Sequence, residues 1–171
     1  RWSSDRISWS DWTEWYDMTR ENSPNELLVK ALPYVKNKGK VIDIGGGALR
    51  DARYLLQEGF DVTVIDKNPL LEEEAKKIEN ERLHTFVTSF EGFNFPVNEY
   101  VLASAMQSLS YCEPEHFGRV MKSIKSSLKK DGIFCGQMYD SYDEESKSPN
   151  SLHKSYQTAD EAREYLKDME I

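Results

Sequence analysis

One stretch of the chain, residues 40–52, limits most strongly what this sequence can fold into. It opens with a short β-branched run, typical of a strand covered on both faces: Val41, Ile42 and Ile44. Glycines follow at once, and glycine permits positive φ and lets a ligand approach the backbone: Gly45, Gly46 and Gly47. The next apolar residues share one helical face: Ala48, Ala52, Leu55 and Leu56. The sequence therefore predicts a strand, a glycine turn and a helix whose first N–H groups point at the turn.

Charged residues around this unit bear on the ligand that it binds. Dinucleotide-binding domains begin in the same way, with the pattern G-x-G-x-x-G. In this chain the pattern is incomplete, because Arg50 stands at the position of the third glycine. Asp43 lies just before the turn, where a carboxylate would repel a pyrophosphate and attract an ammonium or sulfonium group. Asp66 ends a second predicted strand, residues 61–65, and suits ribose hydroxyls in either family. The pattern favours a sulfonium cofactor over a nicotinamide dinucleotide.

At these residues the sequence resembles the class I S-adenosylmethionine-dependent methyltransferases, through VIDIGGG at 41–47 and VID at 64–66. Residues 47–51 and 89–96 look like a group of small bacterial-type methyltransferases. The resemblance extends from about Trp12 to the end of the chain. It implies S-adenosylmethionine as the cofactor and an α/β, three-layer Rossmann-like methyltransferase fold. We expect a mainly parallel sheet in the order 3-2-1-4-5, with the ligand at the switch point.

The same resemblance extends the set of candidate cofactor residues beyond the glycine turn. In the family, the residues just after the third strand lie beside the adenine, here Ser89 and Phe90. An N-terminal Trp/Tyr segment commonly covers the cofactor, and an aromatic face can stabilise a sulfonium. The full predicted set of cofactor-binding residues is Asp43, Gly45, Gly46, Gly47, Asp66, Lys67, Ser89, Phe90, Ala105, Trp15 and Tyr16.

The length of 171 residues predicts a single domain, with residues 1–37 as an N-terminal helical lid or cap and 38–171 as the nucleotide-binding core. Several aromatic residues near the N-terminus fall on one helical face: Trp9, Trp12, Trp15 and Tyr16. Two interpretations of that helix stay open. It can pack on the sheet as core, or it can form a lid over the cofactor.

The remaining pattern continues the alternation of strands and helices. Ser23 is predicted to cap a helix that carries Pro24 in its first turn. Further helices are expected at 70–79, 114–129 and after a capping box at 158–161, and strands at 83–87, 100–105 and 133–138. Residues 140–155 form a polar loop. The C-terminal antiparallel hairpin that usually ends this fold is apparently missing or truncated, since Met169 would begin a sixth strand.

The carboxyl ends of the fourth and fifth strands are expected to bind the acceptor. The candidates offer hydrogen bonds without charge: Gln107, Ser108, Tyr111 and Tyr139. The alternative is that Gln107 and Ser108 only turn the chain. An amine acceptor needs no catalytic base, and a tyrosine would serve a hydroxyl poorly as one. Residues 105–108 (AMQS) lack the Asn/Asp-Pro-Pro-aromatic tetrad of nucleic-acid and glutamine methyltransferases. With a net charge of −8, this favours a small-molecule acceptor over nucleic acid or a membrane surface.

Cysteine and histidine spacing indicates no metal site. Cys112 and Cys135 show no redox or metal-ligand spacing, which favours a reducing, cytoplasmic location. Cys112 could pair with His116, but no third orienting group is evident. The histidines are scattered, with His84 in a strand and His153 in the polar loop. The function predicted is in-line methyl transfer. A nicotinamide-dependent oxidoreductase and a non-catalytic S-adenosylmethionine-binding module are the alternatives.

Overall fold

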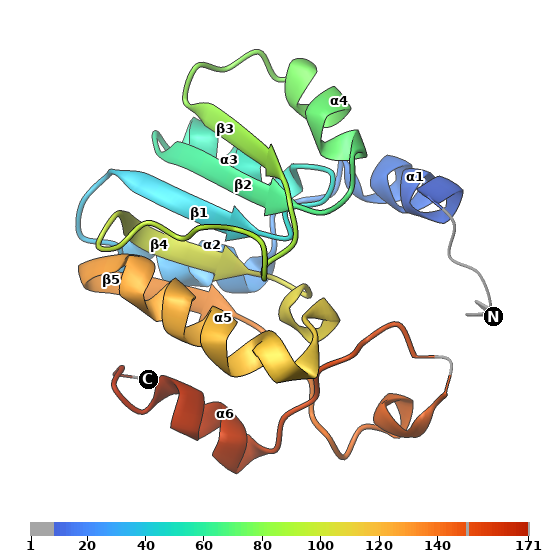
Figure 1. Ribbon diagram of the computed structural model, residues 1–171. Helices are drawn as coiled ribbons and strands as arrows, with labels where there is room; N and C mark the ends of the chain where they lie inside the picture. Colours follow the sequence, from blue (N-terminus) through green and yellow to red (C-terminus); the bar gives the residue numbers. More distant parts are fainter. Residues whose placement is uncertain (1–8, 150, 171) are drawn as a thin grey trace.

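The computed structural model describes residues 9–149 and 151–170, which fold as an α/β domain in three layers (Figure 1). The central sheet has five strands, all parallel, in the order β3-β2-β1-β4-β5. Their bounds are β1 (Lys40–Ile44), β2 (Asp61–Asp66), β3 (Leu83–Val87), β4 (Tyr100–Ala105) and β5 (Leu128–Gly136). The predicted fold class and strand order are confirmed.

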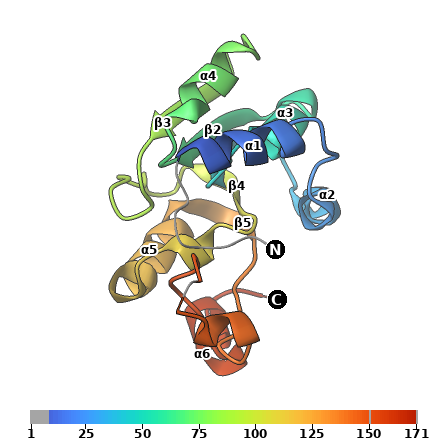
Figure 2. The same cartoon turned by 90° about the vertical axis from the view of Figure 1, so that its right-hand side faces the viewer.

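Helices cover both faces of the sheet. One hydrophobic core joins the sheet to α2, α3 and α4, and the other joins it to α5 and α6. Figures 1 and 2 show α5 and α6 stacked on the side away from α3. The helices are α1 (Trp9–Thr19), α2 (Glu26–Ala31), α3 (Arg50–Gln57), α4 (Leu70–Lys76), α5 (Pro114–Ser127) and α6 (Ala159–Leu166), with short 3₁₀ turns η1 (Leu32–Tyr34), η2 (Leu109–Tyr111) and η3 (Glu144–Lys147).

The apolar runs in β1 and β2 follow from this double cover. In β1, Val41 packs into one core and Ile42 into the other, because successive side chains of a strand point to opposite faces. Both are fully buried, which explains why the strand is a continuous run of apolar residues instead of an alternation of apolar and polar ones. β1 pairs with β2 on one side and β4 on the other, so the strand order reverses at β1. Ligands of such sheets bind beyond the carboxyl ends of the strands at this point.

Helix α1 lies across the carboxyl ends of the strands, beyond the arrowheads in Figure 1. The guanidinium of Arg20, just after α1, donates to both carboxylate oxygens of Glu74 at 2.8 and 2.6 Å. Within the described part of the segment 1–37, which was predicted as a lid, helix α1 lies at this position. Helix α2 instead contributes Leu28 to the core beneath the sheet. The side chain of Trp9 lies outside the described residues.

Three element boundaries differ from the predicted ones. Ser23 does not cap α2. Asn25 is the N-cap, its side chain accepting from the N–H of Leu27 at 3.0 Å, and the α-helix ends at Ala31 because Pro33 lacks the N–H that would continue it. Helix α4 ends at Lys76, before Glu79, whose φ of 48° no helix permits.

The third difference is in β5. Helix α5 ends at Ser127 and the strand starts at once at Leu128, and it ends at Gly136 rather than at 138. Asp131 lies at an irregularity inside the strand, where φ is 63° and the pairing with β4 shifts register. At the other end, Met169 lies in a bend after α6 rather than in a sixth strand.

Candidate functional site

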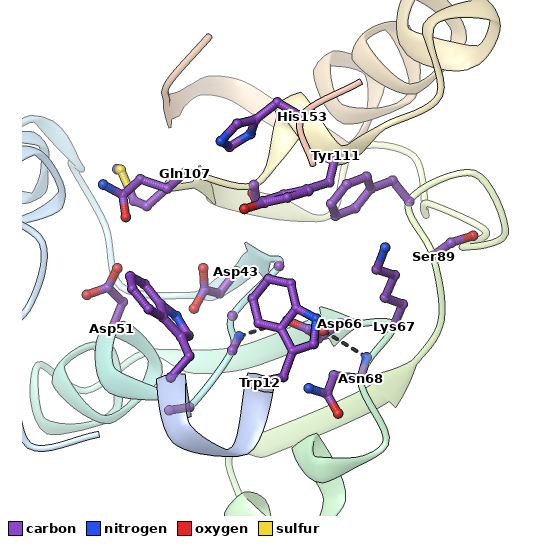
Figure 3. A pocket seen from close by; sticks show the side chains of 18 of the residues that line it. Trp12, Asp43, Asp51, Asp66, Lys67, Asn68, Ser89, Gln107, Tyr111 and His153 are labelled. Carbon is purple, nitrogen blue, oxygen red and sulfur yellow. Dashed lines mark hydrogen bonds between the residues drawn. The ribbon is translucent and has the colours of Figure 1, made fainter. Parts of the chain in front are cut away.

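A cavity of about 690 Å³ opens at the carboxyl ends of the strands, over the switch point. Its wall is formed by the segments that follow β1, β2, β3 and β4, by α1, and by part of the polar loop after β5, residues 140–155, here called the polar segment. Figure 3 shows two sides. Asp43, Asp66 and Asn68 lie on one, and Tyr111, Gln107 and His153 lie across from them. The predicted site residues found on this wall are Trp15, Tyr16, Asp43, Gly45, Gly46, Gly47, Asp66, Lys67, Ser89, Phe90, Gln107, Ser108, Tyr111 and Tyr139.

The glycine turn forms the floor of the cavity. Gly45 and Gly47 have φ of 75° and 52°, which residues with a Cβ rarely adopt. A Cβ on Gly45 would lie 2.4 Å from the Cβ of Ser108. By contrast, a Cβ on Gly47 would meet only the ring of Tyr16, at 3.8 Å, so it would extend into open space. The turn thus leaves its backbone accessible at Gly47.

The carboxylate of Asp66 connects the glycine turn to the end of β2. One oxygen accepts from the backbone N–H of Gly47 and the other from that of Asn68, both at 2.9 Å. Burial raises the pKa of Asp66, although these hydrogen bonds oppose the shift. Each carboxylate oxygen can accept a second hydrogen bond, so two acceptor positions still face the cavity.

Three buried polar atoms on the wall make no hydrogen bond of good geometry among the described residues: Asp43 Oδ2, Tyr16 OH and Asn68 Nδ2. Their residues are only 3%, 2% and 4% exposed, in the same order. The last two atoms belong to neighbouring side chains, since Asn68 lies close enough to the Tyr16 hydroxyl to lower its pKa, whereas Asp43 Oδ2 has no such neighbour. Burial, with the nearby charges of Asp51 and Asp66, raises the pKa of Asp43 well above its usual value. Because unpaired buried polar groups are rare, Asp43 Oδ2 indicates that a polar ligand completes the site.

The opposite side of the cavity is aromatic. The imidazole of His153 stacks on the ring of Tyr139, with centroids 4.3 Å apart, and lies 4.7 Å from that of Tyr111. Trp12 meets Tyr111 edge-on at 6.0 Å. His153 Nδ1 lies 2.6 Å from the hydroxyl of Ser110. This cluster joins α1, η2 and the polar segment at one place.

Several predicted residues have roles in the fold. The hydroxyl of Ser108 donates to the carbonyl of Ile44 at 2.6 Å and so holds the end of β1, in agreement with the alternative interpretation. Gln107 has φ of 55° and turns the chain, with its N–H donating to the side chain of Gln137. Ala105 was predicted to bind cofactor but does not border the cavity. It is fully buried in β4, because the chain reaches the cavity only at Met106.

Sequence reasoning placed His153 in the polar loop and did not name it as a candidate site residue. It also missed the acid Asp51, which is 5% exposed and accepts from the N–H of Asn25 at 2.8 Å. The polar segment is anchored at its far end by the pairing of Asp140 with Gln157. Serine, histidine and lysine in a loop have no periodicity, so no pattern in the sequence could have placed His153.

The thiols are not part of this site. Cys112 and Cys135 are both buried, and neither forms a disulfide. Burial raises the pKa of Cys112 to about 12, so its thiol stays protonated and is not a nucleophile. Among the described residues, no three His, Cys, Asp or Glu side chains are grouped so that they could hold a metal ion. Nor does the described chain contain a helix long and apolar enough to cross a membrane.

Residues 15–169 match the family model described as a methyltransferase domain. The chain therefore belongs to the methyltransferase domain family, and its predicted resemblance to the class I S-adenosylmethionine-dependent methyltransferases is confirmed. This family is not that of the nicotinamide-dependent oxidoreductases, the alternative that the glycine turn had left open. A search of curated proteins finds no sequence match.

Solved structures of methyltransferases share the fold. One is 1,6-didemethyltoxoflavin-N1-methyltransferase of Burkholderia thailandensis with bound 1,6-didemethyltoxoflavin and S-adenosylhomocysteine. Its TM-score is 0.70 at 19% identity, and the match covers 94% of this chain and 74% of that one. Another is phosphoethanolamine N-methyltransferase 2 of Haemonchus contortus with S-adenosyl-L-methionine, at a TM-score of 0.72 and 17% identity. Here the match covers 96% of this chain and 44% of that one. Both likenesses show that the chain has the methyltransferase fold.

Proposed function

We propose that the chain is an enzyme that transfers a methyl group from S-adenosylmethionine to a small-molecule acceptor. One observation carries the proposal. The buried Oδ2 atom of Asp43, unpaired among the described residues, belongs to the wall of a cavity at the switch point of a methyltransferase fold. Leaving such an atom unpaired costs about 1–3 kcal/mol, which a polar ligand would recover.

The wall offers complements for the ammonium group, the ribose and the sulfur of this cofactor. The carboxylate of Asp43 suits the ammonium group, and the remaining acceptor positions of Asp66 suit two ribose hydroxyls. Gly47, with no Cβ, lets the ligand reach the backbone. The aromatic faces of Trp12 and Trp15 suit a cationic sulfur. This assignment of residues is a proposal built on their positions.

S-adenosylmethionine supplies, when bound, a methyl group made electrophilic by a positively charged sulfur. The residues of the chain bind and orient the reactants, which can contribute much of the rate by itself. Tyr111, Tyr139 and Gln107, on the far side of the cavity, would hold the acceptor in line with the methyl group. Their uncharged hydrogen-bonding groups and aromatic rings favour a small, partly apolar acceptor. The related Burkholderia thailandensis enzyme binds a small molecule, 1,6-didemethyltoxoflavin.

Calorimetry with the full chain tests the proposal. We expect S-adenosylmethionine and S-adenosylhomocysteine to bind, and NAD to bind weakly or not at all, because Asp43 would repel its pyrophosphate. Tighter binding of NAD than of either sulfur compound would contradict the proposal. Transfer of a radioactive methyl group to members of a small-molecule panel then tests catalysis. Tight cofactor binding without any transfer would favour the non-catalytic binding module.

A further inference from the structure

The acceptor side of the cavity contains an imidazole that is fixed in position from several directions. His153 lies against the rings of Tyr139 and Tyr111, at centroid distances of 4.3 and 4.7 Å and interplanar angles of 27° and 34°. At its edge, Nδ1 lies 2.6 Å from the hydroxyl of Ser110. These two ring contacts and the contact with Ser110 together fix the position of the imidazole.

The backbone next to His153 is fixed as well. The N–H groups of Lys154 and Ser155 both donate to the carbonyl of Ser110, at 2.6 and 2.9 Å. The hydroxyl of Ser155, which is buried, donates to the carbonyl of Cys112 at 2.7 Å. Ser110 thus contacts the polar segment through its side chain and its backbone. A histidine in a solvated loop would need none of these contacts, whereas one that acts on a substrate needs a fixed position.

Other ionisable groups on this part of the wall are less suited to accept a proton. Glu113 forms an ion pair with Lys154. Glu91 is partly buried, which raises its pKa, but hydrogen bonds such as the one from the Glu113 N–H at 2.9 Å lower it below the ordinary value. His116 also borders the cavity, on the first turns of α5, and is the competitor that an experiment must exclude.

We propose that His153 is the general base of the transfer, that Ser110 is its positioning residue, and that the acceptor is a small molecule whose nucleophilic oxygen or ring nitrogen carries a proton. The inference rests on the proposed function and makes its substrate class specific. In the tautomer with hydrogen on Nδ1, the imidazole donates to Ser110 Oγ, and Nε2 is the basic atom.

The step balances without a further reactant. A lone pair of the acceptor atom forms the bond to the methyl carbon, and the electron pair of the broken methyl–sulfur bond stays on sulfur. The proton of the acceptor O–H or N–H goes to His153, which later releases it to water. Without a base, a neutral hydroxyl would have to become a cationic oxonium during the transfer, so proton removal lowers the barrier.

The test uses para-nitrophenol, which carries a hydroxyl proton and whose phenolate absorbs visible light. In the complex of the full chain with S-adenosylhomocysteine, we expect bound para-nitrophenol to ionise at lower pH than free para-nitrophenol. His153→Asn and His153→Gln should abolish that difference. With S-adenosylmethionine, both variants should lower kcat by roughly 100-fold at pH values below the ionisation of free para-nitrophenol, a typical contribution of a general base, and by little above it, because the phenolate has no proton to lose. Ser110→Ala should lower kcat by roughly 10-fold and keep the pH profile.

Controls separate this role from a structural one. His84→Asn, on the exposed edge strand β3, should change neither ionisation nor turnover. Equal loss in His116→Asn and His153→Asn, or a wild-type pH profile in the His153 variants, would overturn the assignment of the base. Failure of para-nitrophenol to bind would overturn the acceptor class. Failure of the wild-type chain to bind S-adenosylhomocysteine would instead contradict the proposed function.

Discussion

The carboxylate of Asp66 accepts a hydrogen bond from the backbone N–H of Gly47 at 2.9 Å, although the two residues follow different strands. This contact joins the end of β2 to the glycine turn after β1. It fixes the spacing between an acid that can accept hydroxyl groups and a backbone that can lie against a ligand. The fold itself therefore fixes the side of the cavity that is proposed to bind the cofactor.

Replacement of Asp66 tests that arrangement. Two charge-assisted hydrogen bonds to ribose, each about 1.5–3 kcal/mol, would be lost in Asp66→Ala, so S-adenosylhomocysteine should bind at least 100-fold more weakly. Asp66→Asn keeps the size of the side chain and should retain part of the affinity. Asp61→Ala, at the opposite end of the same strand, is the matched control. Unchanged affinity in a folded Asp66→Ala variant, measured by calorimetry, would show that this acid is only a turn residue.

Two glycines with positive φ make it possible to distinguish the backbone strain that an alanine causes from its interference with a bound ligand. Gly47 and Gly59 have φ of 52° and 90°, and a Cβ on either would meet no close protein atom. Gly47→Ala and Gly59→Ala should each lower the free energy of unfolding by about 1 kcal/mol, since alanine is strained there. Only Gly47→Ala should also weaken cofactor binding. Equal affinity in the two variants would mean that the ligand does not approach the turn.

The glycine turn could be predicted because it depends on neighbours in the sequence, whereas the order of the strands was expected from the resemblance to a methyltransferase family. Val41 and Ile42 sit in an unbroken apolar run, and such a run followed by glycines is typical of one local structure. The capping box at Thr158 and Glu161 is likewise local, and the structure contains both of its hydrogen bonds. The pairing of β1 with β2 and β4 then follows from topology rules.

The acceptor side could not be predicted in the same way. His153 reaches the cavity only because Ser110, 43 residues earlier, binds its segment. Ser108 was read as a substrate contact, yet its hydroxyl bonds to the carbonyl of Ile44, 64 residues away. A polar residue at a strand end can serve the chain or the ligand. Which of the two roles such a residue has depends on its hydrogen-bond partner, and that partner is determined by the tertiary structure.

Asp43 is expected to reduce the stability of the unliganded chain. Its pKa is raised above the unfolded value by burial, so ionisation favours the unfolded state as pH rises. Asp43→Asn removes that charge and should raise the free energy of unfolding at neutral pH by about 1–3 kcal/mol. The gain over wild type should be absent in acid and grow as pH rises. Cofactor affinity should fall in the same variant, and a variant that loses stability as well as affinity would contradict this account.

Glu74 anchors α1 and has the opposite pH dependence. Burial alone would raise its pKa, but hydrogen bonds from Arg20 and Lys77 lower it to about 2 from an ordinary value of 4.5. Its contribution, on the order of 3 kcal/mol, is therefore complete above pH 4.5 and is lost as pH falls toward 2. Glu74→Gln should lower the free energy of unfolding at neutral pH and flatten its acid dependence. Glu73→Gln, on the same helix but exposed, should do neither.

The tyrosine hydroxyls on the acceptor side should matter for transfer and not for cofactor binding. Tyr111→Phe and Tyr139→Phe keep the rings that stack on His153, so only the hydroxyl is removed. We expect methyl transfer to fall while the affinity for S-adenosylhomocysteine stays within about 1 kcal/mol, the scale of one net hydrogen bond. Tyr142→Phe is the control, since Tyr142 lies in the same polar segment and is 77% exposed. Equal loss of cofactor affinity and turnover in Tyr111→Phe and Tyr139→Phe would assign these hydroxyls to the fold or to the cofactor instead.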